Sequence, residues 1–201
     1  MQRSFASTKI LQFLVLNQRY PKALSFDFIP RVWSIVMTVS ARAAEVEWIA
    51  PAELRNPDIR SGYAYWDSLR SGNKWPSRHD LDLRELGSAA TYMALLKVID
   101  GGNDFEHRIT GNAVVQAFNV AIQRRRFSEI ADQAPHLIAH SLPIFRRVVQ
   151  DGAPLAWRQR NGLDASPEIY TDSEVVLLPL GESEVDHVLG FAVHSSNLHA
   201  D

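Results

Sequence analysis

The pattern of apolar and polar residues after residue 90 is typical of strands. Residues 92–99 form a near-continuous apolar run that is short enough to be a buried strand. Residues 100–103 (Asp-Gly-Gly-Asn) predict a tight hairpin, because Gly and Asn tolerate the positive φ angles of such turns. Phe105, His107 and Ile109 then alternate with polar residues, which is the period of a half-buried strand. These segments predict a hairpin with one face toward a core.

The next stretch of the chain changes to a helical period. Residues 113–118 predict a short helix, and residues 127–130 predict a single helical turn. A longer helix follows Pro135, since apolar residues recur there on one stripe at helical spacing. It contains Pro143, which predicts a kink, and Gly152 is placed to end it.

Three more strands complete the pattern, over residues 154–160, 169–180 and 185–194, with a turn at Asn161 and Gly162. The order is therefore two strands, a helical crossing and three strands. We expect an α+β domain over residues 91–196, built on a five-stranded antiparallel sheet with the crossing between its second and third strands.

A helical leader is predicted before this domain, over residues 41–90. We expect a helical turn at residues 43–48 and a turn at residues 56–58. A helix follows, for which Ser61 is the expected N-cap and Gly72 the expected stop.

The second half of the leader contains an extended segment fixed by Pro76. After it, Asp80 or Asp82, together with Glu85, predicts the start of another helix. Two acids spaced by two residues project differently from a helix, so we interpret them as caps and not as a catalytic pair.

Composition narrows the class of protein. The 201 residues are 46% hydrophobic, carry a formal net charge of −2 and include no cysteine. The charge gives no electrostatic footprint for nucleic acid, and no apolar run approaches the roughly 18–20 residues of a membrane span. The absence of cysteine removes disulfides and thiolate chemistry and fits a reducing cytoplasm, so we expect a cytoplasmic protein.

Residues 1–40 are an N-terminal extension that the fold prediction leaves out. One hypothesis is that translation starts at Met37, which would make residues 1–36 an artefact of start-site assignment. The alternative is an export signal over residues 32–39, which the polar Ser34 and Thr38 interrupt.

No catalytic or metal-binding constellation stands out among the side chains. His136 and His140 are four residues apart on the long predicted helix, a spacing that suits a metal ion. There is no companion carboxylate in the pattern of a zinc protease, so we expect a solvated helix face and no metal site. The chain also lacks the Gly-x-Ser-x-Gly elbow and the glycine-rich phosphate loops.

An ordered series of short motifs runs through residues 62–195. Its members are Tyr65-Trp66, Leu69, Gly72, Pro76, Arg78, Asp80 and Asp82 in the leader, then Phe105, Arg108, Gly111, Gly152-Ala153-Pro154 and Leu177-Leu178-Pro179-Leu180. This series resembles a bacterial subfamily of PAS domains whose leader has the pattern Tyr-Trp, Leu, Gly, Pro-x-Arg-x-Asp-x-Asp. The resemblance implies the PAS fold, in which two strands, a helical segment and three strands form one concave sheet.

The sequence departs from this subfamily after the second strand. Members of the subfamily continue there with a segment close to Phe-Gly-x-x-x-x-Gly, whereas here Phe118 is followed by Asn119 and, five residues later, by Arg124. The segment corresponds to the helical wall of the PAS cavity, so both glycines are missing from that wall.

The resemblance implies a non-catalytic sensory or protein-interaction module that acts by a population shift, through a protein partner or as a homodimer. We expect no kinase, cyclase or DNA-binding segment after Asp201, and partner surfaces on the outer sheet face and the leader helix. No cofactor is required by the sequence, because the flavin-adduct cysteine is missing and nothing marks a haem ligand. The residues expected to line a cavity are Phe105, His107, Val114, Phe118 and Phe191.

One alternative from another class stays open at the level of sequence. It is a small α+β enzyme with a cone-shaped pocket and a single buried base, for which Asp104, Asp132 and His107 are the candidates. A buried carboxyl group with a raised pKa in a deep apolar pocket would favour this enzyme.

Overall fold

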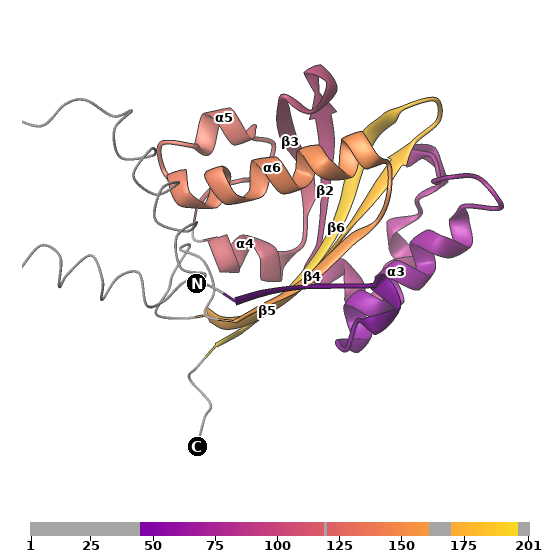
Figure 1. Cartoon of the computed structure of the whole chain (residues 1–201), viewed down its shortest axis with the longest axis horizontal. Helices are drawn as coiled ribbons and strands as arrows, with labels where there is room; N and C mark the ends of the chain where they lie inside the picture. The colour runs from indigo at the N-terminus through magenta and orange to yellow at the C-terminus, as the bar shows by residue number, and fades with distance from the viewer. Residues whose placement is uncertain (1–44, 119, 161–169, 197–201) are drawn as a thin grey trace, which may run out of the picture. The chain divides into compact units, whose positions relative to one another are not determined.

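The computed structural model describes residues 45–118, 120–160 and 170–196 (Figure 1). These residues belong to one compact unit that spans residues 43–201. The hypotheses about residues 1–40 and the turn at Asn161 and Gly162 lie outside the described residues.

The described part contains one antiparallel sheet of six strands, in the order β1-β4-β5-β6-β2-β3. The strands are β1 (Glu45–Ile49), β2 (Met93–Ile99), β3 (Asp104–Thr110), β4 (Leu155–Arg160), β5 (Tyr170–Gly181) and β6 (Val185–Ser196). The α+β class and the five predicted strands are confirmed.

The sixth strand, β1, corrects the prediction of five strands and of a helical turn at residues 43–48. β1 pairs with β4 at the edge of the sheet, where Trp48 lies opposite Trp157. Its sequence Glu-Val-Glu-Trp-Ile alternates polar and apolar residues, so its period of two was already present in the sequence. A five-residue strand is stable only when a partner strand is available, and β4 supplies that partner.

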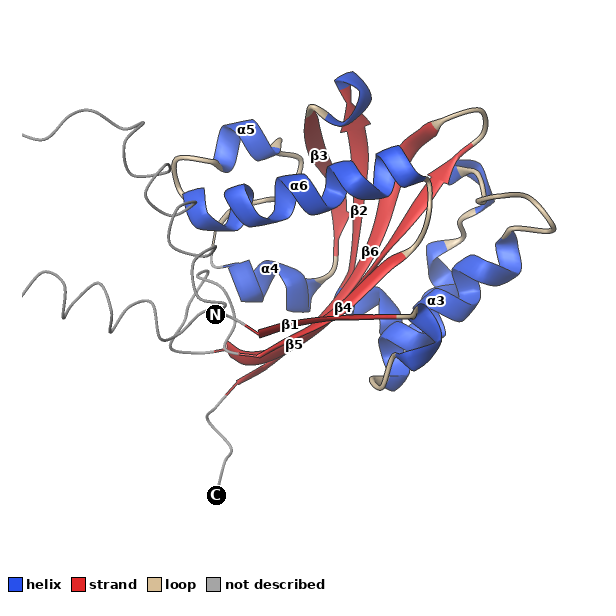
Figure 2. Cartoon of the chain, viewed as in Figure 1, coloured by secondary structure: helices blue, strands red, loops and turns tan. Residues whose placement is uncertain are grey.

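Helical segments connect these strands (Figure 2). The α-helices are α3 (Pro57–Leu69), α4 (Asn112–Phe118), α5 (Phe127–Ile130) and α6 (Pro135–Asp151). The 3₁₀ segments are η2 (Pro51–Glu53), η3 (Arg78–Asp80), η4 (Leu83–Tyr92) and η5 (Asp100–Gly102). The helix predicted after Pro135 is confirmed, and the kink at Pro143 stays a prediction.

The leader helix α3 begins earlier than predicted. The side chain of Asn56 accepts hydrogen bonds from the backbone N–H groups of Asp58 and Ile59, at 2.9 and 3.2 Å. With Pro57 in the first position of the helix, the turn predicted at residues 56–58 is the start of α3, and Ser61 is not the cap. The helix ends at Leu69, before Gly72.

Tyr65 fixes the second half of the leader against the first. Its hydroxyl donates to the carbonyl oxygen of Asp82 at 3.0 Å and accepts from the Asp82 N–H at 2.8 Å. Asp82 is also the N-cap of η4, since its side chain accepts from the N–H of Arg84 at 3.1 Å. Of the two acids considered as caps for a second helix, Asp82 therefore starts η4, while Asp80 lies within η3.

The two faces of the sheet bury two separate cores. On one face the leader packs on the sheet and forms what we call the leader-side core; on the other face α4, α5 and α6 form the crossing-side core (Figure 1). The strands supply both cores because successive side chains point to opposite faces: Val176 and Leu178 belong to the leader-side core, and Val175 and Leu177 to the crossing-side core. The outer face, expected as a partner surface, is instead covered by the leader over β2, β5 and β6.

Candidate functional site

A cavity of about 140 Å³ lies between the sheet and helices α4–α6. We call it the crossing cavity. Its walls are mostly apolar, with contributions from β2–β6 and from all three helices. Its polar lining residues are Tyr92, His107, His140, Ser141, Trp157, Gln159, Ser173 and His194. Its volume is about half of the roughly 300 Å³ at the lower end of pockets for drug-sized ligands, so the space suits a small molecule.

The five residues predicted to line a cavity do not all lie in its wall. His107, Val114 and Phe118 line the crossing cavity. Phe105 does not; its ring packs in the crossing-side core beside the rings of Phe127 and Phe145, with centroids 5.6 and 5.2 Å away.

Phe191 lines the crossing cavity along β6, but its side chain belongs to the leader-side core. Its ring reaches the leader helix so closely that a Cβ atom on Gly62 would lie 2.5 Å from the tip of the ring. Alternation within β6 predicts which residues share a face, but it does not tell which of two buried faces holds the cavity.

His107 is held neutral inside the cavity wall. Burial lowers its pKa to about 4, and a hydrogen bond to the carbonyl of Arg125 opposes that shift only in part. Its Nδ1 atom lies 3.4 Å from this oxygen, while its backbone N–H donates to the same oxygen at 3.0 Å. Since a carbonyl only accepts, Nδ1 carries the proton and Nε2 keeps a free lone pair.

His140 is a cavity-lining residue that sequence reasoning missed. The expected solvated face holds for His136, which is exposed, but His140 is half-buried and lines the cavity. Within the described residues its Nε2 atom is buried with no hydrogen-bond partner, and burial lowers its pKa. The missed signal is its spacing: His140 is three residues after Leu137 and four before Ile144, on the apolar stripe.

No Asp, Glu, Lys or Arg is among the described residues that line the crossing cavity. Asp104 accepts hydrogen bonds from the Phe105 N–H at 2.8 Å and from the Ser128 hydroxyl at 2.6 Å, which fixes the start of α5. Asp132 is exposed. Of the three candidate bases of the enzyme alternative, the two carboxylates therefore do not line the pocket, and only His107 does.

The turn between α4 and α5 contains a strained residue. Arg124 adopts a φ of 57°. This left-handed conformation costs a side-chain-bearing residue roughly 1–2 kcal/mol, and glycine almost nothing. The turn therefore forms at a local cost in energy.

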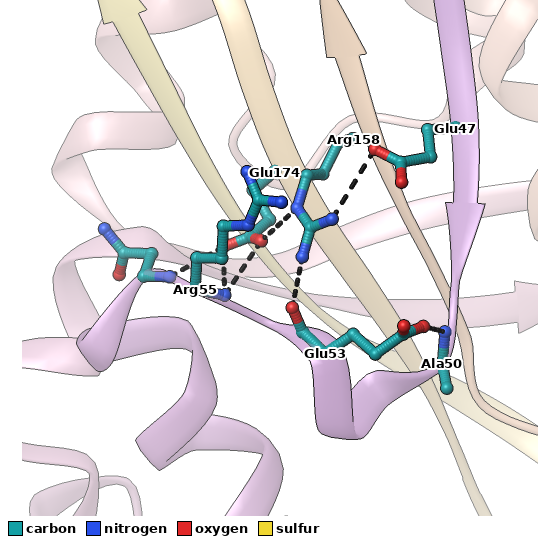
Figure 3. A network of polar contacts seen from close by, with 7 residues as sticks. Glu47, Ala50, Glu53, Arg55, Arg158 and Glu174 are labelled. Atoms are coloured by element: carbon teal, nitrogen blue, oxygen red, sulfur yellow. Dashed lines mark hydrogen bonds and ion pairs between the residues drawn. The ribbon is translucent and has the colours of Figure 1, made fainter.

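A polar network on the opposite face of the sheet joins the leader to β4 and β5 (Figure 3). The carboxylate of Glu174 accepts from the N–H groups of Arg55 and Asn56, at 2.9 and 2.8 Å, and from Arg158 Nε at 3.0 Å. Arg158 also donates to the carbonyl of Glu53 and lies 3.5 Å from the carboxylate of Glu47.

The network lowers the pKa of Glu174. Burial alone would raise this pKa, but the two backbone N–H groups and the Arg158 guanidinium stabilise the carboxylate and outweigh burial. Glu174 is 9% exposed, so the ion pair is largely withdrawn from water. Removing one partner would leave a buried charge uncompensated, and the network therefore fixes the entry to α3 on the sheet.

The same two strands carry both sites. Arg158 and Glu174 lie opposite each other in the β4–β5 register and face the leader. Their neighbours along the strands, Trp157 and Gln159 on β4 with Ser173 and Val175 on β5, line the crossing cavity. The two sites thus share the strands β4 and β5.

A family model described as PAS domain matches residues 54–193, which is most of the chain. The chain belongs to the PAS domain family. No curated protein and no solved structure matches the chain. The match starts at Leu54, so it takes in the leader helix as well as the strands that follow it. Within the described residues, this PAS domain has no helix of the length and apolarity that crossing a membrane requires.

Proposed function

We propose that this PAS domain is a non-catalytic sensory and protein-interaction module that responds to a small molecule in the crossing cavity. Sensing and interaction are the general roles of PAS domains, and membership of the family supports them here. The observation that carries the proposal is that β4 and β5 line the cavity on one face and fix the leader on the other.

The mechanism is a population shift between two arrangements of the leader on the sheet. A ligand that prefers one spacing of β4 and β5 changes the distance from Glu174 to the N–H groups of Arg55 and Asn56. Because these contacts hold the start of α3, their loss raises the opening rate of the leader. The ligand shifts the equilibrium only by its difference in affinity for the two arrangements.

Filling the cavity by mutation tests this coupling without a known ligand. Ala192 lines the cavity from β6, so Ala192→Leu occupies part of the space, whereas Ala139→Leu adds the same atoms on the exposed side of α6. We expect Ala192→Leu, and not Ala139→Leu, to change hydrogen exchange at the amides of Arg55, Asn56 and α3. Identical exchange in both variants would show that the cavity and the leader are not coupled.

The output surface that we propose is the region around Trp48 on β1. Among the described residues this is the one large apolar side chain classed as exposed, at 50%. Its ring lies 5.7 Å from that of Trp157, which lines the cavity, and the Arg147 guanidinium lies 5.8 Å above it. An exposed aromatic ring in contact with a cavity wall suits a protein contact that responds to occupancy.

Sedimentation of the full chain, with and without Trp48→Ala, tests this surface. Self-association that the substitution abolishes supports a homodimer formed there. A wild-type monomer at all concentrations assigns the contact to a different protein, and a dimer that Trp48→Ala leaves intact overturns this surface. A cytoplasmic location and membership of the bacterial leader subfamily stay predictions, supported by the cysteine-free sequence and by the leader motif.

A further inference from the structure

We infer that the crossing cavity takes a neutral, single-ring aromatic molecule that carries a hydroxyl group, that is, a simple phenol. This inference rests on the proposed function, in which the cavity is a ligand site. It goes further by naming the class of ligand from three properties of the walls: volume, charge and the placement of two imidazoles.

Volume limits the ligand to one ring. The cavity holds about 140 Å³. An apolar cavity of roughly 150 Å³ accommodates benzene, so one six-membered ring with one or two small substituents fills this space. Phe118, Phe127 and Phe145 are among the lining residues, and they offer aromatic surfaces for edge-to-face contact.

Charge excludes carboxylates and ammonium groups. None of the described lining residues is Asp, Glu, Lys or Arg, so a charged ligand would find no counter-ion. The imidazoles do not supply one at neutral pH, because burial lowers the pKa of His107, His140 and His194. A ligand that enters must therefore be neutral.

Two imidazoles from different elements specify the polar group. His107 on β3 keeps a free Nε2 lone pair, since its Nδ1–H is directed to the carbonyl of Arg125. His140 on α6 presents a buried Nε2 that has no hydrogen-bond partner among the described residues. A buried polar atom without a partner costs roughly 1–3 kcal/mol, which a ligand group can recover. A hydroxyl both donates and accepts, so it satisfies His140 Nε2 in either tautomer.

Calorimetric titration of the full chain at pH 7 with phenol, toluene and benzoate tests the inference. We expect phenol to bind, toluene to bind about tenfold more weakly, and benzoate to bind more weakly than either. The tenfold factor corresponds to one hydrogen bond of about 1.4 kcal/mol. Equal affinity for phenol and toluene would overturn the role of the hydroxyl, and benzoate binding as tight as that of phenol would overturn neutrality.

His140→Phe and His136→Phe form a matched pair on the same helix, since His136 is exposed and four residues away. We expect His140→Phe to weaken phenol binding about tenfold and to leave toluene binding unchanged, while His136→Phe changes neither. Unchanged toluene binding shows that the cavity is still open in the variant. An equal loss of both ligands would show that the substitution only closes the cavity, and the role of His140 would be wrong.

Failure of this inference is distinguishable from failure of the proposed function. If none of the three compounds binds, the ligand class is wrong, and hydrogen exchange in Ala192→Leu still decides whether cavity and leader are coupled. If phenol binds but exchange in α3 is unchanged, the ligand class stands and the sensory coupling is wrong.

Discussion

The same strands form both faces of the sheet, but one face is tightly packed and the other borders a cavity. On the leader side, the Trp66 ring is fully buried and its Nε1–H donates to the carbonyl of Pro179 at 2.9 Å. The Phe191 ring fills the space left by the missing side chain of Gly62. On the crossing side, α4, α5 and α6 leave a cavity of about 140 Å³ between them and the sheet.

The two faces also differ in how completely their buried polar groups are hydrogen-bonded. The leader side buries a carboxylate, Glu174, with three N–H donors directed at it. The crossing side buries neutral imidazoles, and His140 Nε2 has no hydrogen-bond partner among the described residues. Fully paired polar groups make a rigid, uniquely packed face, while an unpaired group beside a cavity is a place for a ligand. This incomplete packing is why we propose the ligand site on the crossing side.

The largest expected effect is on the leader side. We expect Trp66→Ala to lower the free energy of unfolding by about 3–5 kcal/mol, because it leaves a large cavity and an unpaired carbonyl at Pro179. Urea unfolding followed by circular dichroism measures it, with His136→Ala as a control, since that side chain is exposed. A loss below about 1 kcal/mol for Trp66→Ala would mean that the leader side is not the tightly packed face.

Acid should destabilise the crossing side first. His107 has a pKa of about 4 in the folded state and an ordinary value of 6.5. Between these values the unfolded chain binds a proton that the folded chain does not, so stability falls as the pH drops. The full loss between pH 6.5 and pH 4 is about 3 kcal/mol.

Measuring the free energy of unfolding over that pH range in the wild type and in His107→Gln tests whether His107 causes the pH dependence. Gln does not titrate, so the free energy of unfolding of His107→Gln should depend less steeply on pH. The substitution His79→Gln serves as the control, since His79 is exposed. Equal slopes in the wild type and His107→Gln would place the pH dependence elsewhere.

The leader side should respond to acid only at lower pH. The lowered pKa of Glu174 means that its stabilisation is complete above its ordinary value of 4.5 and is lost as the pH falls through the folded value. We expect Glu174→Gln to cost about 2 kcal/mol at pH 7, the worth of hydrogen bonds to a charged group.

The cost of Glu174→Gln should shrink as the wild-type carboxylate is protonated, whereas the exposed Glu184→Gln should change little at any pH. Denaturant titrations of both variants and the wild type at pH 7 and pH 3 measure these costs. A cost that is the same at both values would mean that shape, and not charge, holds the leader.

The smallest change in stability is expected at Arg124, on the crossing side. Arg124 has a φ of 57°, whereas Arg126, two residues later, has a φ of −82°. Arg124→Gly should raise the free energy of unfolding by about 0.5–1 kcal/mol, since relief of the left-handed conformation exceeds the added entropy of the unfolded chain. Arg126→Gly gains no such relief and should destabilise. Thermal unfolding of both variants tests this, and a destabilised Arg124→Gly would contradict the reasoning.

Most of the secondary structure and the class of fold could be predicted from the sequence alone. The period of two in β3, the apolar run of β2 and the helical stripe of α6 are local patterns, so they were predictable from neighbouring residues. The ordered motifs indicated a PAS domain, and the family match agrees with them. The strand at Glu45–Ile49 was missed although its alternation was present, because a strand of five residues depends on a partner far along the chain.

Which buried face contains a cavity, and which residues line it, depends on tertiary packing. Alternation groups Phe191 with Leu189, but which face the leader helix fills depends on the close approach of Gly62 to the Phe191 ring. The contact of Glu174 with the amides of Arg55 and Asn56 spans more than a hundred residues of chain. Packing and paired charges are long-range interactions, so the sheet could be predicted from local sequence while the cavity and its link to the leader could not.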